Sequence, residues 1–166
     1  MQALLNHYET TAVIVIGLLR NISFRLFIAL RALWTPTAFG VAAIVRDSEG
    51  KILLVRHSYN PGWHLPGGGV GRGEPPDHAV MRELKEEVGL IGGSAIFLSL
   101  HSRKVGWVSN VVALYQIVGA QINFRPNLEI REICFVDPKE PPQGCTPATL
   151  RRLQEFQAGS PPSPHW

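Results

Sequence analysis

The chain has 166 residues, of which 45% are hydrophobic and 17% are charged. This length suits one ordinary domain with a short extension, and the hydrophobic content excludes a chain that is disordered throughout. The formal net charge of +3 is too small to indicate a nucleic-acid-binding surface, and the sequence carries no DNA-binding signature.

Residues 1–36 form an apolar extension that we expect to contain an amphipathic helix. Its longest uncharged stretch runs over residues 10–19, which is too short to cross a membrane as a helix. At helical spacing over residues 20–34, the polar residues share one side and most apolar residues face away from it. Several roles stay open for residues 1–35: packing on the chain's own domain, pairing in a homodimer, peripheral contact with a membrane, or service as a transit segment.

Residues 37–158 carry the alternating and turn-rich patterns of an α/β domain. A hairpin is predicted over 38–57 with a DSEG turn at 47–50, and a loop dense in proline and glycine follows it. Later strands are indicated by β-branched and aromatic residues over 94–100, 107–119 and 132–137. Together with two helices, these strands predict an α/β fold with a mixed sheet between helical layers.

The two helices are predicted by the residues at their ends. The first spans residues 77–88, is entered through prolines and is ended by Gly89 in a left-handed conformation. The second spans about residues 147–157, with Thr146 as its N-cap. The proline-rich residues 159–166 that follow are predicted to be a flexible tail.

The cysteines, Cys134 and Cys145, form no CxxC pair. This usage excludes a disulfide framework and a cysteine-based zinc site. Two reduced thiols are typical of a cytoplasmic protein, which is the localisation that we expect, with peripheral membrane association as an addition if residues 1–35 provide it.

The first predicted helix divides into an apolar face and an acidic face. Its apolar residues share one arc at helical spacing: Val80, Met81, Leu84 and Val88. Glu83, Glu86 and Glu87 share the neighbouring arc, where like charges repel each other. A hard divalent cation such as Mg²⁺ or Mn²⁺ would relieve this repulsion, and glycines 67–69 allow backbone atoms to approach it. The alternative is a solvated acidic face that pairs with the basic residues of the same helix.

Residues 68–90 resemble the Nudix box, G-x5-E-x7-R-E-U-x-E-E-x-G-U, in which U is a bulky aliphatic residue. Every fixed position is filled: Gly68, Glu74, Arg82, Glu83, Leu84, Glu86, Glu87, Gly89 and Leu90. Residues 63–68 are also similar to the family's usual approach to the box, and the resemblance covers residues 38–157. It implies a Nudix-type α/β/α sandwich with a mixed β-sheet, to which residues 1–36 add the N-terminal amphipathic helix.

The resemblance also implies a reaction: hydrolysis, dependent on Mg²⁺ or Mn²⁺, of the pyrophosphate linkage in a nucleoside diphosphate linked to another moiety X. The substrate would be a small-molecule nucleotide. The implied metal ligands are the carbonyl of Gly67 and the carboxylates of Glu74, Glu83, Glu86 and Glu87, with Glu74 in a secondary or water-bridged position. Arg82 would hold a glutamate in place. Glu83 is our first choice as general base, and Glu129 is the alternative.

Substrate contacts are expected from three further positions. Arg56 precedes the loop and can bind a phosphate, while Gly68 and Gly69 let the backbone approach the substrate. The alternative for Arg56 is a surface ion pair with a glutamate. Trp63 is expected to pack in the core under the loop, with stacking on a base as its alternative.

The histidines at 57, 64, 78 and 101 are expected on the surface or in loops, with His101 or Arg103 on the substrate side as an alternative. Residues 105–108 lack the family signatures for ADP-ribose and dinucleoside polyphosphates, so the substrate stays open. Two other functions also stay open: a non-catalytic Nudix-fold binding or regulatory module, and a membrane-associated adaptor that acts through residues 1–35. The complete set of box carboxylates favours the enzyme.

Overall fold

The computed structural model describes residues 22–23, 26–27, 30 and 36–166. The chain divides into two compact units, Met1–Thr37 and Ala38–Trp166. Most of the helix predicted within residues 1–36 lies outside the described residues, although the described positions before residue 36 are helical. Among the residues described, no helix is long and apolar enough to cross a membrane.

Residues 36–166 form strands and helices in the order β1 (Thr37–Val45), β2 (Ile52–His57), α2 (Pro76–Val88), β3 (Leu90–Val105), β4 (Val108–Ile122), β5 (Ile130–Val136) and α3 (Pro147–Ala158). Both helices lie within about one residue of their predicted limits. As predicted, Gly89 follows α2 in the left-handed conformation and Thr146 caps α3. β3 extends beyond its predicted limits because it pairs with β4 over nearly its whole length.

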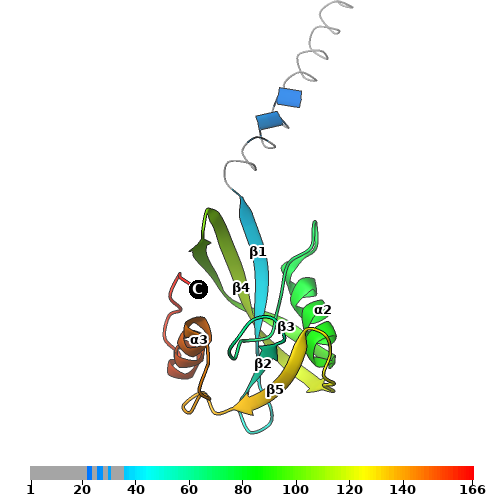
Figure 1. The fold of residues 1–166 in the computed structure, drawn as a ribbon, viewed down its shortest axis with the longest axis vertical. Coiled ribbons are helices and arrows are strands. Elements are labelled where there is room, and N and C mark those ends of the chain that lie inside the picture. Colours follow the sequence, from blue (N-terminus) through cyan, green and yellow to red (C-terminus); the bar gives the residue numbers. More distant parts are fainter. Residues whose placement is uncertain (1–21, 24–25, 28–29, 31–35) are drawn as a thin grey trace, which may run out of the picture. The chain divides into compact units, whose positions relative to one another are not determined.

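The strands form a three-stranded sheet in the order β1-β4-β3 and a two-stranded sheet of β2 and β5. β3 and β4 are antiparallel, whereas β1 and β4 run in the same direction, so the larger sheet is mixed (Figure 1). The helices α2 and α3 lie on opposite sides of the strands (Figure 1). This arrangement confirms the predicted α/β/α sandwich.

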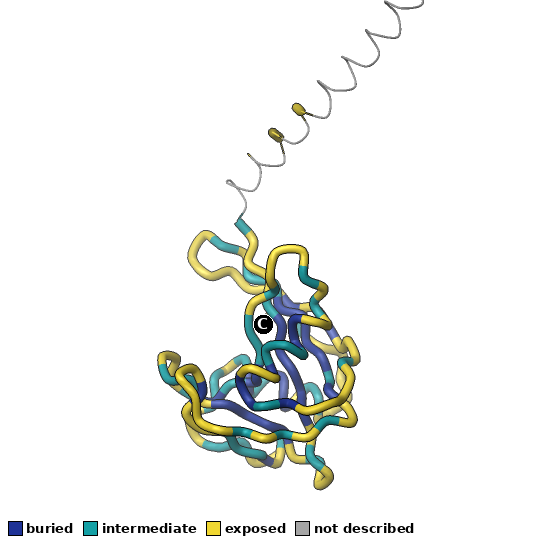
Figure 2. Tube along the Cα trace, turned by 90° about the vertical axis from the view of Figure 1, so that its right-hand side faces the viewer, coloured by how far each residue is buried: buried dark blue, intermediate teal, exposed yellow. Residues whose placement is uncertain are grey.

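β1 supports both helices because its side chains alternate between two cores. Val41, Ala43 and Val45 belong to the core that contains the apolar face of α2. Ala42 and Ile44 belong to the core that contains α3. All five residues are buried, and the buried part of the unit follows the strands (Figure 2). A strand that is buried on both faces has a continuous apolar sequence, as residues 41–45 do.

The predicted hairpin over 38–57 is wrong beyond its turn. Asp47 stabilises that turn, because its Oδ1 accepts two backbone amide hydrogen bonds of 2.9 Å from later turn residues. After a single bridge between Arg46 and Ile52 the strands separate, and β1 pairs with β4 while β2 pairs with β5. The other edge of β1 forms backbone hydrogen bonds with residues 66–70 and is therefore not available for pairing with β2.

The glycine-rich loop, residues 66–70, runs along β1 as an added edge segment. Its backbone bonds with β1 join Val41 N to Gly68 O at 2.9 Å, Ala43 N to Pro66 O at 2.9 Å and Val70 N to Phe39 O at 3.0 Å. Because amide and carbonyl groups alternate in direction along such a segment, those of Gly67 face away from β1. The loop therefore presents Gly67 backbone atoms toward α2.

The last residues pack on the domain, in contrast to the flexible tail predicted over 159–166. Ser102 of β3 forms a bridge with His165. The Ser102 amide donates to the Pro164 carbonyl at 2.9 Å, and the Trp166 amide donates to the Ser102 carbonyl at 3.1 Å. A segment that contains proline can still pair with a sheet edge through its carbonyl groups.

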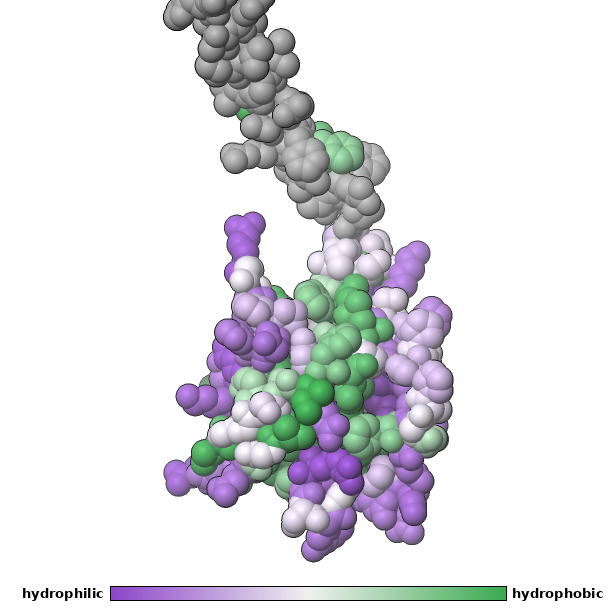
Figure 3. Space-filling view, turned by 180° about the vertical axis from the view of Figure 1, so that it is seen from behind, coloured by the Kyte–Doolittle hydropathy of each residue, from purple (hydrophilic) through white to green (hydrophobic). Residues whose placement is uncertain are grey.

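Apolar side chains remain exposed along the outer strand β3. They are Ile91, Ile96, Phe97, Leu98, Leu100 and Val105. Seen from behind, one face of the molecule shows a continuous apolar area with polar margins (Figure 3). Areas of this kind are typical of contact surfaces.

Cys134 and Cys145 are both free thiols, as the sequence predicts. Burial raises the pKa of Cys134 to about 11, and burial also raises the pKa of Cys145. Both thiols are therefore neutral at ordinary pH, which makes them poor nucleophiles and poor metal ligands.

Candidate active site

The acidic face of α2 runs from solvent into the core. The apolar face predicted for this helix is buried or partly buried, so the faces are assigned correctly. Beside it, the side chains of Glu87, Glu83 and Glu86 are 3%, 15% and 56% exposed. The three carboxylates are neighbours on one helix face, but they differ widely in exposure to solvent. Their charged forms are therefore stabilised to different extents.

Glu87 is a buried carboxylate without a full countercharge. Its Oε2 accepts a hydrogen bond of 2.8 Å from the Gly67 amide. The nearest basic group is the His57 ring, whose Nδ1 lies 3.9 Å from Oε1. Within residues 36–166, no lysine or arginine forms an ion pair with Glu87. Burial raises the pKa of Glu87 to about 8, and the negative charge of Glu83 adds to this effect.

Arg82 gathers the other box carboxylates. Its guanidinium donates to both oxygens of Glu74, at 2.8 and 3.0 Å, and to the carbonyl of Gly69 at 3.0 Å. It also donates to Glu83 at 2.9 Å and to Glu86 at 3.2 Å. Hydrogen bonding from Arg82 lowers the pKa of Glu74 to about 2. Arg82 thus contacts Glu74, Glu83 and Glu86, but it forms no ion pair with Glu87.

Two glycines of the loop, Gly67 and Gly68, make contacts that leave no space for a Cβ. Gly67 has a φ of +145°, and a Cβ there would lie 2.2 Å from the Val41 carbonyl oxygen. A Cβ on Gly68 would lie 2.3 Å from an oxygen of Glu83, so the Glu83 carboxylate rests against the backbone of Gly68. Only glycine permits the loop to fit between β1 and the acidic face of α2.

The residues present suit a hard divalent cation. Among the described residues, no three His, Cys, Asp or Glu side chains already converge closely enough to hold an ion. The donor set nevertheless consists of oxygen atoms, and the buried Glu87 carboxylate lacks the cation that would offset its burial. If Glu83 and Glu86 turn from Arg82 toward Glu87, the acidic face and the Gly67 carbonyl form an all-oxygen site.

Asn127 connects the end of α2 to the loop that carries Glu129. Its Nδ2 donates to the carbonyls of Glu87 at 3.1 Å and Glu86 at 3.4 Å. Its Oδ1 accepts from the amides of Glu129 at 3.0 Å and Ile130 at 2.7 Å. Glu129 is exposed on this loop, and its charge adds to the effect of burial in raising the pKa of Glu87. Sequence reasoning missed Asn127, because a lone asparagine in a loop carries no spacing signal.

Arg56 already has protein partners. Its Nη1 forms an ion pair of 3.0 Å with Glu132, its neighbour across β2 and β5. Its guanidinium also lies over the Trp63 ring, 4.3 Å from the centroid. The structure therefore shows the ion-pair alternative for Arg56, and it buries Trp63 in the core, as expected.

Two histidines differ from the expectation of surface or loop positions. His57 is largely buried, and its Nδ1 has no hydrogen-bond partner among the described residues. Burial lowers its pKa, so the ring is neutral at ordinary pH. His101 is 1% exposed and lies in a polar network beneath the C-terminal residues. Both errors arise because polarity alone does not reveal which histidines have buried partners.

Comparison with known proteins decides the family. The model of the NUDIX domain matches residues 36–155. The chain belongs to the NUDIX domain family. Within this family, an RNA pyrophosphohydrolase of Hydrogenovibrio crunogenus is 48% identical over 50 residues, which are 30% of this chain and 30% of that protein. An ADP-ribose pyrophosphatase of Methanocaldococcus jannaschii is 34% identical over 97 residues, covering 54% of this chain and 57% of that protein.

The chain matches these two relatives over 30% and 57% of their length. Among solved structures, the MutT NUDIX hydrolase from Burkholderia pseudomallei is similar with a TM-score of 0.63 and 26% identity, over 71% of this chain and 96% of that one. In the present Nudix domain, the box comprises most of the glycine-rich loop and α2, where Glu87 accepts from the Gly67 amide and Glu83 lies against Gly68.

Proposed function

We propose that this Nudix domain is a divalent-metal-dependent hydrolase of a pyrophosphate linkage in a nucleoside diphosphate linked to a moiety X. The products would be a nucleoside monophosphate and phosphorylated X. One observation carries the proposal: Glu87 is buried, lacks a full countercharge and lies beside the Gly67 backbone and the Glu83 charge. The two relatives, an RNA pyrophosphohydrolase and an ADP-ribose pyrophosphatase, both cleave pyrophosphate linkages, which supports the reaction class.

The proposed metal ligands are Glu83, Glu86 and Glu87 with the Gly67 carbonyl, and Glu74 is a secondary ligand. A bound Mg²⁺ or Mn²⁺ would neutralise charge on the pyrophosphate and lower the pKa of a bound water. Arg82 has a positioning role, because its contacts with Glu74 and Gly69 anchor it between loop and helix.

Glu83 is our first choice to accept the proton of the attacking water, because it rests on Gly68 at the edge of the buried site. The water oxygen forms a bond to one phosphorus while the bridging P–O bond breaks. Glu129 is the alternative base, since it is exposed on the loop that Asn127 ties to α2. The variants Glu83→Gln and Glu129→Gln separate the two, because a general base acts in its deprotonated form and its loss removes the rise of rate with pH on the acidic limb of the pH–rate profile.

Substrate phosphates are proposed to meet the backbone of Gly68 and Gly69. Arg56 can join them only by leaving Glu132, with which it is paired. The two relatives are named for different substrates, RNA and ADP-ribose, so the moiety X is left to experiment.

The test is a substrate panel with Mg²⁺ and Mn²⁺ that includes nucleoside triphosphates, nucleotide sugars, dinucleotides, ADP-ribose and RNA with a 5′-triphosphate or cap. We expect metal-dependent release of a phosphate-containing product, abolished by chelator. Glu87→Gln should lack it, whereas Glu140→Gln, a change at an exposed glutamate, should retain it. Nucleotide binding without hydrolysis of any member would instead favour the non-catalytic module.

For residues 1–35 we retain the proposal of a contact with a membrane surface or with a second copy of the chain. The described residues Ile22, Leu26, Phe27 and Leu30 are helical, apolar and exposed. Co-sedimentation with anionic vesicles, compared with a chain that starts at Thr37, tests the membrane contact. Equal sedimentation of both chains would contradict it, and a difference in molecular mass in solution would indicate the dimer.

A further inference from the structure

A cavity of about 350 Å³ opens beside the glycine-rich loop. Its walls come from β1, the loop, β4 and the last residues of the chain. They include the backbone of Gly67–Gly69, which contacts the acidic face of α2, and also the side chains of Asn110 and Trp166. This volume lies within the range of about 300–1,000 Å³ that is typical of small-molecule sites.

Trp166 brings a large aromatic surface to this cavity. The residue is partly exposed, and it also lines a second cavity, of about 380 Å³, that contains Arg103 and Arg151. The face of an indole ring is suited to stacking on a planar group such as a nucleobase. From the sequence, a position on the substrate side is an alternative for Arg103. The structure places Arg103 in the wall of this second cavity.

Two buried side chains pack against the Trp166 ring, which also contacts the core beside α3. The His101 ring centroid lies 5.5 Å from that of Trp166, and the Arg152 guanidinium carbon lies 5.7 Å from it. Both supporting residues are 1% exposed. A ring that is held in place before the ligand arrives loses little conformational entropy on binding.

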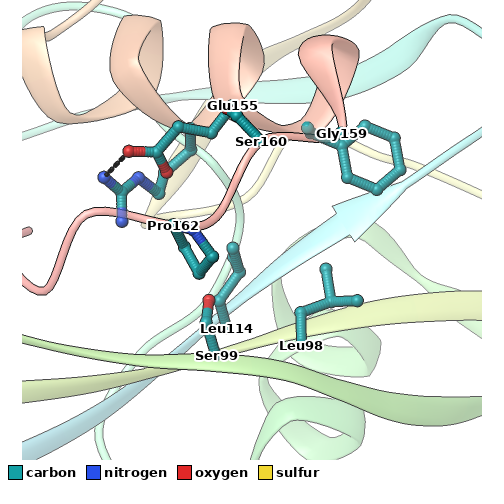
Figure 4. Close-up of a pocket in the computed structure, with 9 residues that line it drawn as sticks. Leu98, Ser99, Leu114, Glu155, Gly159, Ser160 and Pro162 are labelled. Atoms are coloured by element: carbon teal, nitrogen blue, oxygen red, sulfur yellow. Dashed lines mark hydrogen bonds and ion pairs between the residues drawn. The ribbon is translucent and has the colours of Figure 1, made fainter.

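The supporting pair belongs to a hydrogen-bond network that also anchors the tail. His101 Nδ1 donates to the Ser163 carbonyl at 2.7 Å, and Arg152 Nη1 donates to His101 Nε2 at 2.9 Å. Arg152 Nη2 donates to Glu155 Oε1 at 2.8 Å. This bond is the dashed line in Figure 4, which shows a third cavity, of about 280 Å³, lined by Ser99, Glu155 and Pro162. It also donates to the His165 carbonyl at 3.3 Å, next to Trp166.

We propose that Trp166 binds the nucleobase of the substrate by stacking on it, while Arg152 and His101 are positioning residues for its ring. This inference rests on the proposed function, which places the substrate phosphates at the glycine-rich loop and α2. A nucleoside that extends from there into the adjoining cavity reaches the indole face. The Asn110 amide in the same cavity offers a donor and an acceptor to the edge of a base.

Binding of nucleotide products, measured by calorimetry, tests the stacking directly. GMP and ribose 5-phosphate are titrated into the wild type, Trp166→Ala and Trp166→Phe, with Trp107→Ala as the control at an indole that is 76% exposed in the β3–β4 turn. Loss of a base stack should weaken GMP binding by about 5- to 100-fold in Trp166→Ala. Ribose 5-phosphate, which has no base, should bind all variants alike. Trp166→Phe should keep most of the affinity for GMP, because phenylalanine retains an aromatic face.

Unchanged GMP affinity in Trp166→Ala would overturn the inference. An equal loss for ribose 5-phosphate would also overturn it, because that result indicates a collapsed site and not a lost stack. The proposed reaction and the stacking site can fail separately. If GMP binding depends on Trp166 but no nucleotide in the substrate panel is hydrolysed, the proposed reaction is wrong and the stacking site remains supported.

Discussion

Each helical layer of this Nudix domain buries one charged residue, and the two charges differ in what surrounds them. Arg152 in α3 faces Glu155, His101 and the carbonyls of the C-terminal residues, and only its Nε lacks a partner within the described part. Glu87 in α2 has one backbone amide and a neutral histidine at 3.9 Å. The described residues therefore supply hydrogen-bonding and ionic partners for Arg152, whereas they supply no full countercharge for Glu87.

This difference separates a structural charge from a functional one. Burying an ion costs several kcal/mol unless partners offset it. For Arg152 the partners are present, and the outcome is a tail fixed to the sheet. For Glu87 the partner that we propose is a divalent cation, which prefers oxygen ligands and would complete the site.

The largest effect is expected on turnover when Glu87 is changed. Glu87→Gln keeps the side-chain shape and an acceptor for the Gly67 amide but removes a ligand charge. We expect kcat to fall about 1,000-fold, which corresponds to about 4 kcal/mol, with no loss of folding stability. Steady-state kinetics and urea unfolding measure the two quantities. Turnover near that of the wild type would refute the role of Glu87 in metal binding.

The opposite pattern is expected at Arg152. Arg152→Gln leaves Glu155 without its partner and frees the tail, so the free energy of unfolding should fall by about 3–5 kcal/mol. Arg125→Gln, at an exposed arginine, is the control and should change it by less than about 0.5 kcal/mol. Urea unfolding provides the comparison. A loss as small as that of the control would show that the Arg152 network is not structural.

Asn127 should affect both stability and rate. Asn127→Ala removes hydrogen bonds at the end of α2 and in the Glu129 loop, which should lower stability by about 1–2 kcal/mol. It should also lower kcat about tenfold, as expected when a support of a metal site is lost. Asn123→Ala, at an exposed asparagine on the preceding segment, serves as control. Unchanged kcat in Asn127→Ala would limit this residue to a local capping role.

The smallest effect expected is a pH-dependent shift in melting temperature without metal. Between its ordinary pKa of 4.5 and the raised value of about 8, Glu87 holds a proton in the folded state that the unfolded state has released. Stability contributed by this group therefore falls as pH rises through that window. Glu87→Gln should match the wild type near pH 4.5 and melt a few degrees higher at pH 8.5, at roughly 2–4 °C per kcal/mol. Mn²⁺ should abolish the difference at pH 8.5; a constant difference across pH would contradict the assigned burial effect.

The sequence was most informative where structure is local. The end signals at Gly89 and Thr146 located both helices, and the spacing of Glu83, Glu86 and Glu87 placed them on one face. These features depend on residues within a few positions of one another, so periodicity and capping chemistry reveal them.

Contacts between segments far apart in the chain could not be predicted from periodicity and capping residues. The pairing of β1 with the glycine-rich loop, the contacts of Asn127 with α2 and the packing of Trp166 on His101 each join segments far apart in the chain. The tail was misjudged because its prolines indicate an irregular segment but do not show that Arg152 and Ser102 supply partners for its carbonyls.

Crystals soaked in Mn²⁺ give the most direct test of the central claim, that the acidic face of α2 and the Gly67 carbonyl hold a divalent cation. We expect anomalous density in contact with oxygens of Glu83, Glu86 and Glu87, with Glu83 and Glu86 turned away from Arg82. No density there at saturating Mn²⁺, with both glutamates still bound to Arg82, would contradict it.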